Sequence, residues 1–269
     1  MGEMSVPERL EVQQMELRNL TSSFLFGLKF IAMNSSREPG YFENHLLSYL
    51  FQELLESSVA LSILVHEGIL NCAKRELRFI LEASVKLCLV QQDAVPGSDS
   101  KHAERRPPVS VSDKLDAFKR ELNSPSITAR KWVEIHLLDD ETTTSQFHEE
   151  VGRLYGELSG YTHLSARQVQ ERMIAVEAGR TAGLEAPEDV EGFNRLAERV
   201  LSCSMVFIMH SVYDWVVGDL LVESDGASLN WKLAESRFIA RIDEFFDYKH
   251  ERQDRLSEIR SARAAKVRY

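Results

Sequence analysis

Apolar residues recur at helical spacing along most of the chain. Between residues 10 and 33, Phe24, Leu28 and Ile31 follow one another at intervals of four and three positions, which places them on one face of a helix. The polar run over residues 34–40 contains a Pro-Gly pair and ends the pattern. These positions predict a first long helix.

Comparable patterns predict the remaining elements. The segment 70–90 has almost no polar side, so we expect it in the middle of a bundle. Residues 95–109 are polar and proline-bounded and predict a mobile loop or an insertion point, whereas residues 127–138 fit either a helix or an irregular connector. Helices are predicted over residues 41–65, 70–90, 112–122, 142–161, 166–178 and 187–222, followed by two helices or one broken helix over 231–269.

The fold class that follows is all-α. Proline occurs 7 times and glycine 13 times in 269 residues, and this scarcity favours long helices over many short strands. No stretch has the composition of a long flexible linker, so we expect the helices to share one core. The chain is therefore predicted to form a single-domain bundle of long helices over residues 1–248 and a basic C-terminal helical tail over residues 249–269.

The charge pattern bears on possible partners. A formal net charge of −10 is unlike that of a non-specific DNA binder, which needs clustered Lys and Arg, so we expect no DNA partner. The last part of the tail is locally basic and could contact RNA or an acidic partner, or form a solvated helix end. Its basic residues are Arg255, Arg260, Arg263, Lys266 and Arg268.

Nothing in the chain directs it to a membrane or to export. The first residues, MGEMSVPERLEVQQ, lack the apolar core of a signal peptide. The apolar stretch over residues 200–222 is interrupted by polar groups such as Ser202, His210 and Asp214, and predicts a buried helix. The three cysteines lie within apolar helical patterns, as reduced buried thiols do. We expect a cytoplasmic protein.

Several kinds of chemistry have no visible site. The chain contains no GxxxxGK[ST] loop, no GxGxxG, no GxSxG and no HExxH, which are the motifs of triphosphate hydrolysis, dinucleotide binding, serine hydrolysis and zinc proteolysis. No histidine has a glutamate three residues before it, as a di-iron helical bundle would need. We therefore predict neither a metal nor a cofactor.

The first constellation of interest lies on the apolar segment 70–90. Arg78 and Glu82 are four residues apart, and Arg75 lies on the same face. A guanidinium and a carboxylate on so apolar a helix need partners, because burying an unpaired charge costs several kcal/mol. The three residues indicate either a structural ion pair or a functional pocket.

The second constellation is on the helix predicted over residues 142–161 and just beyond it. Tyr155, Ser159 and His163 recur every four residues and share a stripe if the helix continues, with Arg153 nearby. A histidine in this position could act as an acid or a base, because its pKa lies near neutrality. It could equally cap the last carbonyl groups of the helix.

A third pair, His210 and Asp214, has helical i,i+4 spacing within the segment 187–222. The two residues form at most half a metal site, and the alternative is a hydrogen-bonded pair in the core.

Two of these segments carry a resemblance to known proteins. The sequence R-E-L-R-F-I-L-E, followed by Y-G-E-L-S-G-Y-T-H-L-S, resembles uncharacterised bacterial helical proteins, which look like relatives of the HEPN superfamily. The resemblance covers roughly residues 41–166 and implies a HEPN-like core with a C-terminal helical extension. The residues that carry it are Arg78, Glu82, Tyr155, Leu158, Ser159 and His163.

HEPN proteins occur in toxin–antitoxin and phage-defence systems, and many cleave RNA without a metal. The resemblance implies His163 as acid or base and an arginine, Arg153 or Arg78, as the phosphate contact. This chain departs from the family motif, in which the arginine precedes the histidine by five to seven positions, because Arg153 precedes His163 by ten. The one literal match is Arg130 with His136.

Three functions follow as alternatives. The first is a helical interaction or regulatory protein of a bacterial stress or phage-defence system, acting through protein partners or as a homodimer. The second is a HEPN-like metal-independent endoribonuclease that uses His163 with an arginine. The third is a small-molecule sensor with a pocket between helices.

Overall fold

The structure is a computed structural model that describes residues 4–92, 111–122, 138, 140–162, 165–180, 185–221 and 231–245, with residues 261, 265 and 267. All elements within these ranges are helices, which confirms the all-α prediction. They are α1 (Val6–Ser35), α2 (Tyr41–Asn44), α3 (Leu47–His66), α4 (Leu70–Gln92), α5 (Val111–Leu122), α6 (Glu141–Thr162), α7 (Ala166–Glu177), α8 (Pro187–His210), α9 (Asp214–Leu221), the 3-10 helix η1 (Lys232–Glu235) and α10 (Arg237–Phe245).

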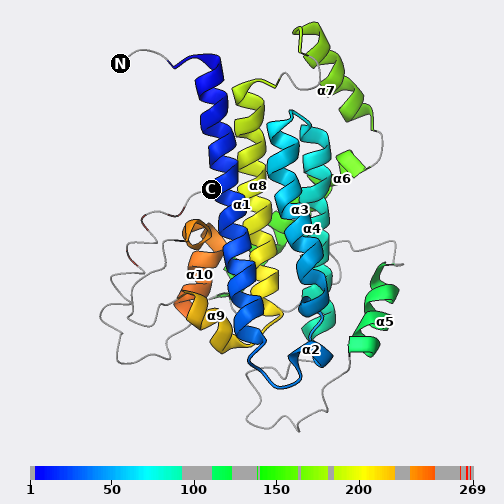
Figure 1. The fold of residues 1–269 in the computed structure, drawn as a ribbon, viewed down its shortest axis with the longest axis vertical. Coiled ribbons are helices and arrows are strands. Elements are labelled where there is room, and N and C mark those ends of the chain that lie inside the picture. The colour runs from blue at the N-terminus through cyan, green and yellow to red at the C-terminus, as the bar shows by residue number, and fades with distance from the viewer. Residues whose placement is uncertain are drawn as a thin grey trace.

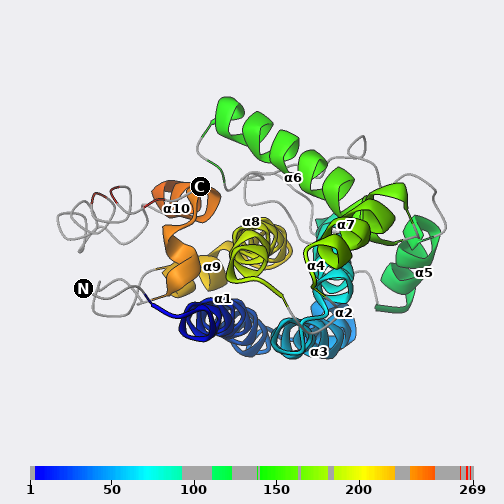
Figure 2. The same ribbon diagram turned by 90° about the horizontal axis from the view of Figure 1, so that it is seen from above.

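Four long helices form the centre of the molecule. Helices α1, α3, α4 and α8 pack in a ring in which each contacts the next, and Figure 2 shows this arrangement end-on. Helix α6 packs on α4, while α9, η1 and α10 cover α1 and α8. The molecule is thus a four-helix bundle with added helices on two sides (Figure 1).

Helix α4 lies inside the bundle, as its apolar pattern predicted. It contacts α3, α5, α6 and α8, and within residues 70–91 only Arg75 and Phe79 are exposed. Helix α8 is enclosed as well: all ten residues over 200–209 are buried, because α8 contacts α1 on one side and α4 on the other.

Two of the predicted helices, over residues 41–65 and 187–222, are each divided into two helices, and the residues at the two breaks contact each other. His45 adopts an extended conformation between α2 and α3, and its ring Nε2 lies 2.8 Å from the carbonyl oxygen of Ser211. Ser211 is the C-terminal cap residue of α8, and its hydroxyl donates to the carbonyl of Ile208 at 2.7 Å. The segment 187–222 is therefore two helices, and its break separates His210 from Asp214, which do not share one helix face.

Other boundaries agree with the sequence. The predicted break at residues 66–68 is confirmed: α3 ends at His66, and Gly68 takes a positive φ of 68° that favours glycine. Among the described helices, none is long and apolar enough to span a membrane. Cys88 and Cys203 are buried and Cys72 is half-buried. The predicted loop over residues 95–109 and nearly all of the predicted tail over 249–269 lie outside the described residues.

The C-terminal part of the described chain is held against α1 by Trp231. Its indole Nε1 donates to the carbonyl of Ser23 at 2.7 Å, and its ring packs on Gly27. A Cβ added at Gly27 would lie 2.7 Å from Cζ2 of Trp231 and 3.0 Å from Cε of Met205. Both neighbours belong to the core, so this close approach requires glycine.

We expect Gly27→Ala to lower the free energy of unfolding by about 1–3 kcal/mol, because the extra methyl group overpacks a buried contact. Urea unfolding measures the change. Gly156→Ala is the matched control: it lies in α6 with nothing within 4 Å of the added Cβ, and should stabilise the protein by roughly 0.5–1 kcal/mol. Equal effects of the two substitutions would contradict this account of the Trp231 contact.

Candidate functional site

The side chain of Arg78 joins α4 to α6. Its Nη2 donates to the hydroxyl of Tyr155 at 2.8 Å, its Nη1 donates to the hydroxyl of Ser159, and its Cζ lies 4.3 Å from the centre of the Tyr155 ring. Its Nε lies 3.6 Å from a carboxylate oxygen of Glu82. All three guanidinium nitrogens of Arg78 therefore have partners within the fold.

Glu82 is shared between two cations. Besides Arg78, its carboxylate receives a hydrogen bond of 2.5 Å from the ammonium group of Lys86, one turn further along α4. The side chains are 27 % exposed for Glu82 and 5 % for Lys86. One carboxylate thus compensates two largely buried positive charges.

Arg75 lies on the same helix but has a different partner. Its Nε donates to the carbonyl oxygen of Tyr161 at 2.8 Å, at the end of α6, and its remaining guanidinium nitrogens make no hydrogen bond to another described residue. The structure brings Arg78, Glu82, Tyr155 and Ser159 into one network, and places Arg75 beside it.

Of the two residues predicted as catalytic, Arg153 is not part of this network. Arg153 is two positions from Tyr155 and so lies on the other side of α6. Its side chain is 55 % exposed and binds the carboxylate of Glu150 at 2.8 Å, which also accepts from Arg199 of α8. His163 lies outside the described residues, as do Arg130 and His136.

A second cluster surrounds Tyr161, which the sequence analysis did not single out. The Tyr161 hydroxyl donates to Glu171 of α7 at 2.7 Å, and the ammonium group of Lys74 lies 4.0 Å from the ring centre. Burial, followed by the hydrogen bond to Glu171, raises the pKa of Tyr161. Burial also lowers the pKa of Lys74, although Glu171, 3.8 Å away, opposes that shift. Tyr161 was missed because its spacing from Leu154 and Leu158 is that of an ordinary core residue.

The same cluster fixes the start of α7. Gln168 donates from Nε2 to the Tyr161 carbonyl at 3.0 Å, so Gln168 and Arg75 share that oxygen. Ser165 caps the helix, because its hydroxyl accepts from the Gln168 backbone N–H at 3.3 Å while the Gln168 side chain accepts from the Ser165 N–H. The Ser-x-x-Gln spacing is a capping box that could have been found in the sequence.

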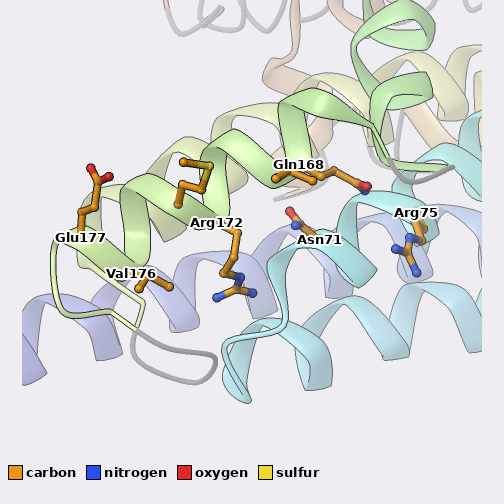
Figure 3. A pocket seen from close by; sticks show the side chains of 8 residues that line it. Asn71, Arg75, Gln168, Arg172, Val176 and Glu177 are labelled. Atoms are coloured by element: carbon orange, nitrogen blue, oxygen red, sulfur yellow. The ribbon is translucent and has the colours of Figure 1, made fainter.

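An open groove lies between α7 and the first turns of α4. Its volume is about 540 Å³, and Figure 3 shows α7 crossing above α4 at this point. One side of the groove is apolar, formed by Val169, Met173 and Val176, which are 47 %, 58 % and 57 % exposed. An adjoining cavity of about 450 Å³ is lined by charged groups that include Lys74 and Glu171.

These contacts define what the site can do. The hydroxyl and guanidinium groups of the Arg78 network are satisfied internally, so they fix α6 on α4. In the described part of the chain, no group of three or more His, Cys, Asp or Glu side chains is placed to hold a metal. The groove, by contrast, offers apolar surface next to N–H donors of Arg75 that no other described residue accepts, which suits binding.

Comparison with known proteins gives no relative: no family model matches the chain, and no curated protein or solved structure matches it.

Proposed function

We propose that the protein is a helical interaction protein that binds a protein partner through the groove between α4 and α7. The observation that carries the proposal is that α7 is anchored at its start but leaves its apolar side chains exposed. Its first turn is fixed by Tyr161 and Gln168, yet four large apolar side chains remain about half exposed. These are Val169, Met173, Ile174 and Val176.

Exposed apolar residues are common singly, but a row of them on one anchored helix marks an interaction surface. Val169, Met173 and Val176 are spaced by four and three positions, the spacing of a helix face that packs on another helix. The resemblance to HEPN relatives supplies the biological setting of the proposal, a bacterial stress or phage-defence system.

The proposal is tested by placing a photo-reactive amino acid at position 173 or, as a control, at position 33. Met173 and Met33 are 58 % and 60 % exposed, but Met33 lies at the end of α1. We expect a discrete cross-linked protein in cells from position 173 only, and a complex that re-forms from the two purified components. Identical cross-linking patterns from both positions would contradict the proposal.

A second experiment in cells tests the ribonuclease alternative, in which His163 acts with Arg153 or Arg78. Because Arg78 is engaged by Tyr155, Ser159 and Glu82, we expect total RNA to remain intact when either the wild type or His163→Ala is induced. RNA fragments produced by the wild type only would instead assign the activity to His163.

A further inference from the structure

The groove between α4 and α7 carries a charge pattern as well as an apolar side. Arg75 of α4 and Arg172 of α7 both line it. Within the described residues, Arg172 makes no hydrogen bond or ion pair within 4 Å, and Arg75 uses only its Nε. The groove therefore presents N–H donors of two guanidinium groups that no other described residue accepts, although Glu185 lies close enough to Arg172 to interact with it electrostatically.

The two guanidinium groups come from the two helices that form the groove, Arg75 from α4 and Arg172 from α7. Arg75 shares the Tyr161 carbonyl with Gln168, and Arg172 is one turn beyond Gln168 on α7. Figure 3 shows Arg75 near the start of α7 and Glu177 at the opposite end, where the groove has its one acidic lining residue.

The apolar and charged residues of the groove together indicate what kind of partner binds there. We infer that the groove binds an amphipathic helix of a partner protein that carries acidic residues along the edge of its apolar face. The apolar face of that helix packs against Val169, Met173 and Val176, while its acidic edge pairs with Arg75 and Arg172. This inference rests on the proposed function, because it names the chemistry of the partner that the same groove binds.

A helix fits this surface better than a small molecule does. Sites for small ligands bury most of the ligand surface, but this groove is open, and its apolar residues remain 47–58 % exposed. The apolar stripe also extends from Val169 to Val176 of α7, which is about the length of two helical turns. An acidic edge on the partner supplies the bidentate carboxylate contacts for which guanidinium groups are suited.

The inference is tested with a phage-displayed library of single helices with randomised surface positions, selected on the full-length protein. We expect the enriched helices to carry acidic residues beside an apolar stripe. Their dissociation constants should rise at least tenfold for Arg172→Glu and for Met173→Glu. They should be unchanged for the matched controls Arg18→Glu and Met33→Glu, which alter exposed residues of α1.

Charge reversal provides the decisive step. Replacing each acid of a selected helix in turn by lysine should weaken its binding to the wild type, and the replacement at the acid that pairs with Arg172 should restore its binding to Arg172→Glu, if that variant keeps the helical circular dichroism of the wild type. Enriched helices without an acidic edge, or binding that Arg172→Glu leaves unchanged, would overturn the inference. A cross-linked partner that meets position 173 through a basic or non-helical segment would overturn it as well, yet would leave the proposed function standing.

Discussion

Glu82→Ala should lower the free energy of unfolding by about 3 kcal/mol, because it leaves the cations of Arg78 and Lys86 without their shared carboxylate. The Lys86 side chain is only 5 % exposed, so water cannot replace the lost partner. Chemical denaturation followed by circular dichroism measures the change. Arg78 retains the hydroxyl groups of Tyr155 and Ser159, which limits the loss.

The matched control is Glu76→Ala on the same helix. Glu76 makes no hydrogen bond or ion pair with another described residue, so its removal should change the stability by less than about 0.5 kcal/mol. Adding Lys86→Met to Glu82→Ala should recover part of the loss, because one of the two uncompensated charges disappears. If Glu82→Ala and Glu76→Ala behave alike, the shared carboxylate of Glu82 does not stabilise the cations of Arg78 and Lys86.

Lowering the pH from 7 to 5 should cost the protein about 2 kcal/mol of stability through His45 alone. Burial lowers the pKa of His45 to about 4, and the nearby positive charge of Lys114 acts in the same direction, against the hydrogen bond to Ser211. A histidine whose folded pKa lies below its unfolded value of 6.5 stabilises the fold fully above that value. The contribution is lost as the pH falls from 6.5 toward 4.

The contacts of His45 explain why it resists protonation. The Ser211 carbonyl can only accept, so Nε2 carries the proton. The backbone N–H of Leu47 donates to Nδ1 at 3.2 Å, and a proton on Nδ1 would face that N–H.

The change between pH 7 and pH 5 should therefore shrink by about 2 kcal/mol in His45→Gln, as measured by urea unfolding at each pH. The full change in stability between pH 7 and pH 5 should persist in His66→Gln, because the ring of His66 is exposed. Equal pH dependence of His45→Gln and the wild type would show that His45 does not titrate in this way.

The sequence predicted well what depends on neighbours along the chain. Apolar spacing located α1, α4, α6 and α7 to within a few residues, and the four-residue intervals joining Arg78 to Glu82 and Tyr155 to Ser159 placed each pair on one face. These features follow from helix geometry, which repeats every 3.6 residues.

What the sequence could not predict depends on residues far apart along it. His45 and Ser211 are 166 positions apart, and their contact divides two segments whose apolar patterns are continuous. Arg75 and the Tyr161 carbonyl are 86 positions apart, and this contact helps to create the groove under α7. No local periodicity specifies which helix faces which, because the choice depends on how several apolar faces are buried together.

The contact between Trp231 and Ser23 has a consequence for synthesis in the cell. It joins residues 208 positions apart, and α1 also packs on α8 and α9. Helix α3, which also covers α1, is synthesised soon after it, whereas α8, α9 and Trp231 follow much later. The face of α1 that packs on these later elements has no native partner until they emerge from the ribosome, so the core of the bundle forms late in translation.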